Sequence, residues 1–339
     1  MQWSRHQLNF QLRHVGVKSY SDVTPERFNQ FSQKVSMVGD VSGLDAYPSN
    51  DERYEQELER VTVVAELTTN HCGDLDRLRE MIALAKKSGA DYVKVQKRNV
   101  DTFYSKAALE ESYESPFGKT FGDYRRNIEL DRDGFKSLEE ACKAHDIGWF
   151  CSVLDIKSFE FMMEFSPQML KLPSTVSVHD ELLRYVAAHY SGDIVISTGY
   201  TDQSYEEKVL KLFENCKRIY LLQCISSYPT RQFDANVAVV RRYASLSENN
   251  PRVIPGYSSH DIGNLCSMLA VAAGARMIEK HVTIGDNAFL HFDHVAVRMD
   301  TGEFAAFVSE IRKCERILGS ETKRVLKSEH HKYWLPPSS

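Results

Sequence analysis

The sequence carries two kinds of polar side chain at the ends of short apolar runs. Lys94 and Lys171 lie in YVKVQ and MLKLPS, and an ammonium group enclosed by apolar neighbours needs an anion, so the pair predicts a phosphate or carboxylate site. His260 and His281 follow two further apolar runs, and imidazoles at matching positions can bind a divalent metal. The two kinds together indicate chemistry on a phosphorylated small molecule.

Other polar residues occur at the same kind of position. Each has an ordinary structural interpretation, since Ser and Thr after strands are usually turn formers or helix caps, and a single Lys is more often exposed or paired. The spacing of Lys94 and Gln96 places both on one face of a strand. The residues at such positions are Glu66, Gln96, Ser152, Ser174, Ser197, Thr198, Ser226, Tyr228, Ser258 and Glu279.

The elements that must position these residues alternate from residue 61 onward. Apolar runs of strand length, such as VTVVAEL, alternate with amphipathic stretches such as LDRLREMIALAKKSG, and about eight such units follow one another. Eight strand-helix units predict an α/β fold of the (β/α)8 TIM barrel type, in which the carboxyl ends of the strands carry the active site. A doubly wound open sheet is the alternative, but only Gly73 offers a glycine in the first turn.

The organisation along the chain has three parts. Residues 1–60 are polar and show no period, so we expect an N-terminal extension, followed by a barrel over 61–318 and a tail over 319–339. One stretch, residues 97–131, is too long for a simple connector and is expected to be a lid or a binding loop.

Composition excludes several classes of protein. The 42 Lys and Arg against 47 Asp and Glu give a net charge of −5, which does not favour a nucleic-acid binder. No run approaches the roughly 18 apolar residues of a membrane span, and the N-terminus lacks the apolar core of a signal peptide. The 7 Cys are odd in number and form no CxxC pair, which predicts reduced thiols and a cytoplasmic location.

Several strings together resemble one known family, the sialic acid (N-acetylneuraminate) synthases and related nonulosonic acid synthases. The resemblance covers roughly residues 61–318, and the strings are VAELTTNHCGD, GADYVKVQ, KLPS, ISTGY, LLQCISSYPT, GYSSH, GARMIEKHVT and FDH. The family's fold is a (β/α)8 barrel, in agreement with the strand count.

The resemblance implies a transferase that condenses phosphoenolpyruvate with a sugar aldehyde and releases phosphate, with a divalent metal such as Mn²⁺ or Mg²⁺. By matching position, the metal ligands would be His260 and His281. Phosphoenolpyruvate would be held by Lys94, Lys171, Ser174, Ser197 and Ser258, with Ser226 at a further polar contact. Gln96 would line the same pocket, and the sugar or its aldehyde would face Glu66, Tyr228, Glu279 and Asp293.

The sequence also departs from the family. Its members usually carry a C-terminal antifreeze-like domain that reads the acetamido group of the sugar, and this chain ends about twenty residues after the last expected helix. The usual Ser-Gly-Glu reads Ser174-Thr175-Val176, and the usual Ser-Asp-His reads Ser258-Ser259-His260. These changes fall mostly on the sugar side, so we expect a different acceptor, either without an acetamido group or of the phosphorylated or shorter kind used by 3-deoxy-octulosonate and heptulosonate synthases.

Two alternatives remain open. A non-catalytic homologue could bind a sugar or phosphate, although it would have no reason to retain Glu66 with both lysines and both histidines. A Schiff-base aldolase could use Lys94 or Lys171, provided that the lysine has a lowered pKa. The resemblance also implies a homodimer.

Overall fold

The computed structural model describes residues 60–285, 295–321 and 323. The expected N-terminal extension, most of the expected tail and Asp293 lie outside the described residues. Within the two long ranges, no helix has the length and apolar character that crossing a bilayer requires.

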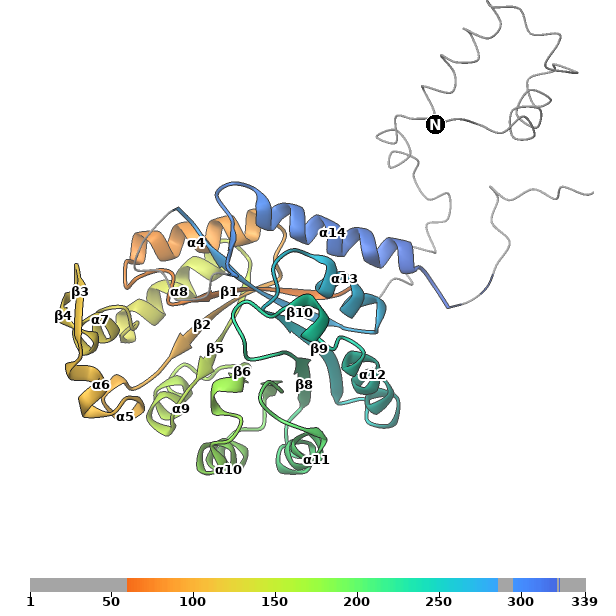
Figure 1. The fold of residues 1–339 in the computed structure, drawn as a ribbon, viewed down its shortest axis with the longest axis horizontal. Helices are drawn as coiled ribbons and strands as arrows, with labels where there is room; N and C mark the ends of the chain where they lie inside the picture. Colours follow the sequence, from red (N-terminus) through yellow and green to blue (C-terminus); the bar gives the residue numbers. More distant parts are fainter. Residues whose placement is uncertain (1–59, 286–294, 322, 324–339) are drawn as a thin grey trace, which may run out of the picture. The chain divides into compact units, whose positions relative to one another are not determined.

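Eight parallel strands form a closed barrel (Figure 1). The spatial order β1-β2-β5-β6-β7-β8-β9-β10 follows the chain, and β1 pairs with both β2 and β10, so the sheet has no open edge. This closure confirms the barrel prediction and excludes the open doubly wound sheet. The strands are β1 (Thr62–Thr68), β2 (Tyr92–Lys97), β5 (Gly148–Val153), β6 (Met169–Leu172), β7 (Asp193–Ser197), β8 (Arg218–Gln223), β9 (Val253–Ser259) and β10 (Met277–Thr283). A short strand, β11 (Val297–Arg298), extends the sheet beyond β10.

Helices follow the strands and surround the barrel (Figure 1). Several begin at a side-chain cap of the kind that satisfies the first free amides, as at Asp74, Asp131 and Asp155. The outer helices are α4 (Leu75–Lys87), α8 (Arg132–Ala144), α9 (Ile156–Met163), α10 (Asp180–His189), α11 (Gln203–Leu212), α12 (Val239–Asn249), α13 (Leu265–Ala272) and α14 (Glu303–Leu318). Two 3₁₀ turns, η3 (Ser174–Val176) and η4 (Gln232–Asp234), follow β6 and β8.

The long segment after β2 folds into short regular elements instead of an irregular loop, and its role as a lid or binding segment stays a prediction. It contains α5 (Val100–Phe103), α6 (Lys106–Glu110), a hairpin of β3 (Ser112–Ser115) and β4 (Gly118–Thr120), and α7 (Phe121–Asn127). We call residues 98–130 the insertion. These elements are too short to show a period, and a cluster of aromatic rings around Tyr104, Tyr113, Phe121 and Tyr124 holds them together.

An apolar layer fills the barrel interior on the amino-terminal side of the site residues. It consists of Val64, Phe150, Met169, Val195, Tyr220, Leu222 and Met277. Because side chains two residues apart on a strand share a face, the next inward positions on these strands are Glu66, Ser152, Lys171, Ser197, Cys224 and Glu279. The apolar layer therefore supports a polar layer directly above it, at the carboxyl end of the barrel.

Candidate active site

The centre of the polar layer is a group of buried charges from four strands. Glu66 and Lys94 come from β1 and β2, and their carboxylate and ammonium groups form an ion pair. Lys94 Nζ also lies 3.1 Å from Glu279 Oε2, and Lys171 Nζ lies 2.5 Å from Glu279 Oε1. Ser258 Oγ donates to the same Glu279 oxygen at 2.8 Å. The structure thus brings five predicted residues into one network.

The charges of this network balance, because two ammonium groups face two carboxylates. Burial lowers the pKa of Lys94 to about 7, even with Glu279 beside it. Burial also opposes ionisation of Glu279, but Lys171 and Lys94 outweigh it and hold the pKa of that carboxyl below its ordinary value. Glu279 is therefore charged at neutral pH, and Lys94 is the group whose protonation responds to pH near 7.

Hydroxyl groups surround a cavity of about 280 Å³ beside this network. Ser174, Ser226 and Tyr228 line it, together with Tyr200. Their close approach requires Gly199, because a Cβ there would lie 2.3 Å from Ser226 Oγ and 2.9 Å from Cys224 Sγ. Within the described residues, the buried hydroxyls of Ser152 and Ser197 have no hydrogen-bond partner. Such hydroxyls are available to a ligand that enters the barrel mouth.

The two histidines lie against each other beside the same cavity. The ring centroids of His260 and His281 are 5.3 Å apart, and Tyr228 packs on His260 with its centroid at 4.2 Å. His260 Nδ1 lies 2.7 Å from the carbonyl oxygen of Ile225, and its Nε2 lies 3.2 Å from the Tyr228 hydroxyl. A backbone carbonyl on Nδ1 makes that nitrogen the donor and leaves Nε2 with a lone pair.

The imidazole groups of these two histidines are suited to bind a divalent metal. Burial and the neighbouring His281 lower the pKa of His260 to about 3, so the imidazole is neutral and can ligate. In the part of the chain that the structure describes, His, Cys, Asp and Glu side chains form no group of three that could hold an ion. Water or substrate would have to fill the remaining positions around such an ion.

A second network holds the segment that carries His260. Lys280 is buried on the outer side of β10 and donates to Ser259 Oγ at 2.8 Å and to the Asp261 carbonyl at 2.6 Å. Ser259 and Tyr257 both donate to Asp261 Oδ1, at 2.9 Å each. Asp261 therefore supplies a buried carboxylate next to Ser259. Because both neighbours of His260 in the chain are bonded in this network, the backbone at His260 is held in place. The sequence reasoning missed both Lys280 and Asp261.

Arg98 is a further residue that the sequence reasoning missed. It lies two residues beyond Gln96, which is two beyond Lys94, and this spacing is the signal that was available. Its NH2 group donates to Gln96 Oε1 at 2.7 Å. Gln96 itself extends the inward face of β2 above Lys94, and its side chain remains partly exposed.

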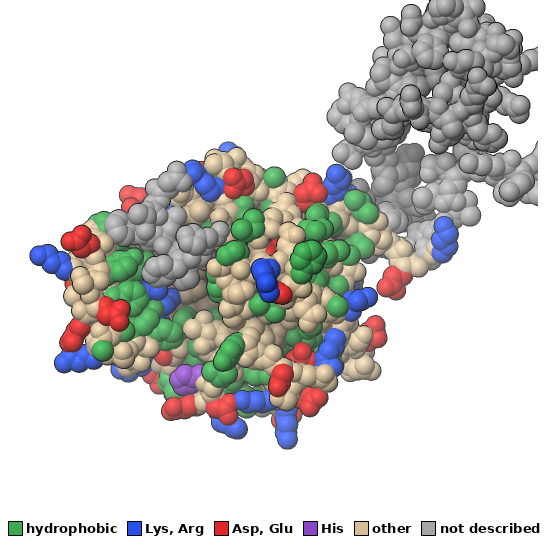
Figure 2. Space-filling view, viewed as in Figure 1, with side chains coloured by type: hydrophobic (Ala, Val, Ile, Leu, Met, Phe, Trp, Pro, Cys, Tyr) green, Lys and Arg blue, Asp and Glu red, His purple; other side chains and the backbone are tan. Residues whose placement is uncertain are grey.

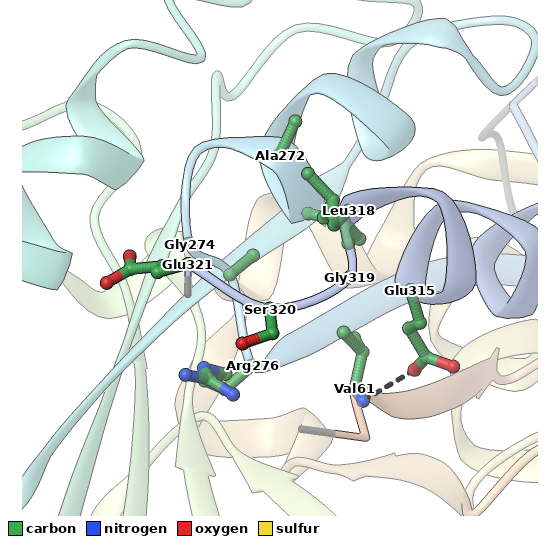
Figure 3. Close-up of a pocket in the computed structure, with 11 residues that line it drawn as sticks. Val61, Ala272, Gly274, Arg276, Glu315, Leu318, Gly319, Ser320 and Glu321 are labelled. Carbon is green, nitrogen blue, oxygen red and sulfur yellow. Dashed lines mark hydrogen bonds between the residues drawn. The ribbon is translucent and has the colours of Figure 1, made fainter. Parts of the chain in front are cut away.

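A larger cavity lies at the opposite end of the barrel and contains none of the predicted residues. It has a volume of about 360 Å³ and is lined by Val61, Arg276, Glu315 and Leu318, among others (Figure 3). In enzymes with this barrel fold, the active site lies at the carboxyl ends of the strands, and residues at the amino ends contribute to stability. We therefore place the active site at the carboxyl end. Figure 2 shows acidic and basic side chains interspersed around the rim of the face in view.

Comparison with known proteins identifies the family. Residues 81–323 match the NeuB family. The N-acetylneuraminate-9-phosphate synthase of Mus musculus is 34% identical over 270 residues, which cover 79% of this chain and 74% of the relative. The N,N'-diacetyllegionaminic acid synthase of Legionella pneumophila is 31% identical over 77% of this chain and 74% of the relative. The crystal structure of a sialic acid synthetase from Leptospira borgpetersenii, in complex with citrate, matches with a TM-score of 0.66 and 27% identity over 79% of this chain and 88% of that one.

The matched segment runs from within α4 to beyond the end of α14 and includes seven of the eight barrel strands, with Lys94, Lys171, Glu279 and both histidines, so the family and the geometry agree. The curated relatives are synthases, which makes the chain a condensing enzyme of the transferase class. This chain belongs to the NeuB family, the family of sialic acid and nonulosonic acid synthases.

Proposed function

We propose that the chain condenses phosphoenolpyruvate with a sugar aldehyde to form a 3-deoxy-2-ulosonic acid and releases phosphate. The observation that carries this proposal is the buried network of Lys94, Lys171, Glu66 and Glu279 at the barrel mouth, next to a cavity lined by hydroxyls. Two buried ammonium groups suit a ligand with a phosphate and a carboxylate, and the carboxylates beside them suit proton transfer.

The lysines and serines would bind phosphoenolpyruvate. Lys94 and Lys171 would exchange part of their contact with Glu66 and Glu279 for the anionic groups of the substrate. Ser174 and Ser226 line the cavity, while the Ser197 hydroxyl, without a partner among the described residues, supplies a further donor. Because these donors are already in place, binding requires little reorganisation of the barrel.

The reaction balances without an oxidant or a reductant. The C3 carbon of phosphoenolpyruvate forms a bond to the aldehyde carbon, and the aldehyde oxygen takes up a proton to become a hydroxyl. Water adds to C2 and gives up a proton, and the C2–O bond to phosphate breaks to leave the ketone. We assign these proton transfers to Glu66 and Glu279, with the ionised Glu279 as the acceptor of the proton from water and Glu66 as the group that delivers a proton to the aldehyde oxygen. The two lysines stabilise the departing phosphate.

We further propose that His260 and His281 hold a divalent metal, Mn²⁺ or Mg²⁺. When bound there, the ion would supply Lewis-acid polarisation of the carbonyl oxygen of the acceptor. The neutral imidazole of His260, with Nδ1 bonded to the Ile225 carbonyl, supports this assignment. Tyr228 closes the same corner of the cavity, where the acceptor would lie against it.

The acceptor that we favour is a phosphorylated aldose. The name of the mouse relative places a phosphate on carbon 9 of its product. If phosphoenolpyruvate supplies the first three carbons, that phosphate derives from carbon 6 of the sugar. That acceptor either carries an acetamido group, as in the product that the mouse relative is named for, or lacks one and is shorter, as in 3-deoxy-octulosonate or heptulosonate synthesis. Val176 and Ser259, which stand where the family usually has carboxylates, favour the acceptor without the acetamido group.

The test is phosphate release from phosphoenolpyruvate with Mn²⁺ across aldoses that differ in acetamido and phosphate groups. We expect release with one class of aldehyde, loss of release after chelation, and no recovery in His281→Ala when Mn²⁺ is restored. Absence of release with every aldehyde, despite metal binding, would favour a binding homologue. Trapping of a lysine by borohydride would instead identify a Schiff-base aldolase.

We also propose a homodimer in the cytoplasm. All seven cysteines are free thiols, and six of them are buried, which suits a reducing compartment. Apolar side chains are exposed on the segments after four successive strands, at Val178, Tyr200, Phe233 and Ile262, and such a group of side chains is typical of an interface. Light scattering of the purified protein measures the mass in solution, and a mass near 38.8 kDa would exclude the dimer.

A further inference from the structure

Arg98 directly follows β2 and is the first residue of the insertion. Its side chain is buried, with 4% of the residue exposed. Each guanidinium nitrogen faces a different partner: NH2 donates to Gln96 Oε1 at 2.7 Å, NH1 donates to the Tyr104 hydroxyl at 2.8 Å, and Nε lies 2.8 Å from Glu129 Oε1. The Arg98 guanidinium therefore connects Gln96 at the end of β2 with Tyr104 and Glu129, which lie near the two ends of the insertion.

The contact with Gln96 fixes which way its carboxamide points. A guanidinium can only donate hydrogen bonds, so the amide atom that faces it must be the carbonyl oxygen. The NH2 group of Gln96 is therefore turned away from Arg98. None of the described residues bonds to this NH2 group, and Gln96 lies on the inward face of β2, above Lys94.

The other two contacts keep the guanidinium in place. Glu129 also accepts the Arg98 backbone amide at 3.1 Å, so one carboxylate binds both the main chain and the side chain of the arginine. The Tyr104 ring packs edge-on against Phe121 at 5.1 Å, which connects it to the aromatic cluster of the insertion. The orientation of Gln96 is thus determined by the insertion, through Arg98.

We propose that Arg98 is a positioning residue for the acceptor. It holds the Gln96 carboxamide so that its NH2 group donates to an oxygen atom of the sugar, and it makes the insertion part of the acceptor site. The inference rests on the proposed function. It assigns Gln96 to the acceptor and not to the phosphoenolpyruvate pocket that the resemblance implied, because Gln96 lies one layer above the lysines. Arg98 should then act on the acceptor through Gln96 and have little effect on phosphoenolpyruvate.

The experiment is a double-mutant cycle on the full chain. Phosphate release is measured for the wild type, Gln96→Ala, Arg98→Met and the double variant, with KM determined separately for the aldehyde and for phosphoenolpyruvate. We expect each single variant to raise the KM of the aldehyde roughly tenfold, as the loss of an oriented hydrogen bond does, and to change that of phosphoenolpyruvate less than about twofold. The double variant should resemble Gln96→Ala, because the two residues act as one unit.

Two further variants keep the proposal testable if Arg98→Met folds poorly. Gln96→Glu retains an oxygen for Arg98 but presents a second oxygen to the sugar, so its aldehyde KM should rise at least as much as that of Gln96→Ala. Arg126→Met is the matched control, since Arg126 lies in the insertion, is exposed and forms an ion pair only with Asp101 among the described residues. It should behave like the wild type.

Additive effects in the cycle, or equal changes in the KM of both substrates, would overturn the inference and leave the proposed function intact. An unaltered aldehyde KM in Gln96→Glu would also overturn it. A wild-type protein that releases no phosphate with any aldehyde would overturn the proposed function, and the inference with it.

Discussion

Lys94 is the group whose ionisation should set the upper pH limit of activity. Its pKa is lowered to about 7 by burial, so it is protonated below that pH and loses its charge above it. A neutral lysine no longer attracts an anion. We therefore expect kcat/KM for phosphoenolpyruvate, which reports groups of the free enzyme, to fall above pH 7 by up to about tenfold per pH unit.

A pH profile of kcat/KM at saturating aldehyde measures this directly. The control is Lys94→Arg, whose guanidinium stays charged across the range, so any activity that it retains should lack the fall above pH 7. A wild-type profile that stays flat from pH 7 to pH 9 would show that Lys94 keeps its proton in the free enzyme.

His71 makes stability depend on pH in the acid range. Burial and the nearby Arg77 lower its pKa to about 4, below the ordinary 6.5 of the unfolded chain. Between these values the unfolded state binds a proton that the folded state does not, so stability is complete above pH 6.5 and is lost as the pH falls toward 4. The shift corresponds to about 3 kcal/mol, as an order of magnitude.

His71→Asn should remove this dependence. The histidine Nδ1 accepts the Gly73 amide at 3.1 Å, and an Asn oxygen can take the same place without titrating. Urea unfolding at pH 7 and pH 4.5 should show a smaller loss of stability in the variant than in the wild type. His260, whose pKa is also lowered, titrates in both proteins and cancels from the difference. Equal losses in the two proteins would contradict the prediction.

The ends of β7 and β8 meet at a point where only glycine fits. A Cβ at Gly199 would lie 2.3 Å from Ser226 Oγ and 2.9 Å from Ser174 Cβ, so Gly199→Ala must displace the cavity wall. We expect the KM for phosphoenolpyruvate to rise about tenfold or more, while the barrel remains folded, because misplaced donors bind poorly. Gly134→Ala in α8 is the control and should leave KM unchanged, because its added methyl would meet Leu130 Cδ2 at 3.0 Å and Leu130 Cβ at 3.2 Å on the outer layer of helices, away from the cavity.

Steady-state kinetics of both alanine variants measure the KM for phosphoenolpyruvate, and a thermal melt shows whether each variant is folded. A normal KM in Gly199→Ala would mean that this part of the cavity does not hold phosphoenolpyruvate.

The elements differ in how well the sequence predicts them. Strands of a closed parallel barrel are buried on both faces, so they stand out as apolar runs, and their polar ends mark the site. This is why Glu66, Lys94, Lys171 and Glu279 could be named before the fold was known. The short elements of the insertion were not predicted because four- and five-residue helices carry no period.

Contacts between residues far apart in the chain could not be predicted, because the sequence does not show which side chains the fold brings together. Arg98 acquires its role from Glu129, which lies 31 residues further along, and from the amide orientation of Gln96. Lys280 looked like one more polar residue in IEKHV, and only its burial against Ser259 and the Asp261 carbonyl reveals it as a support for His260.

At the scale of the whole molecule, α14 is fastened to the amino end of the barrel, beside the start of β1. Asp91, which precedes β2, accepts the Val63 amide at 2.8 Å and pairs with Arg312 of α14 at 2.8 Å. Arg312 also donates to the Val61 carbonyl at 2.7 Å, and Glu315 accepts the Val61 amide at 2.6 Å. Residues more than 200 positions apart are thereby held at the amino end of the barrel, opposite the active site.

Arg312→Met should therefore destabilise the fold without altering catalysis. The variant leaves Asp91 and the Val61 carbonyl partly buried with one partner fewer, which costs about 1–3 kcal/mol. Arg79→Met is the control, because Arg79 forms an exposed pair with Asp76 that contributes at most about 0.5 kcal/mol. Urea unfolding should separate the two variants, with unchanged KM values for both substrates in each. If Arg312→Met were as stable as the control, α14 would be held on the barrel by apolar packing alone, through its buried residues Phe304, Phe307 and Ile311.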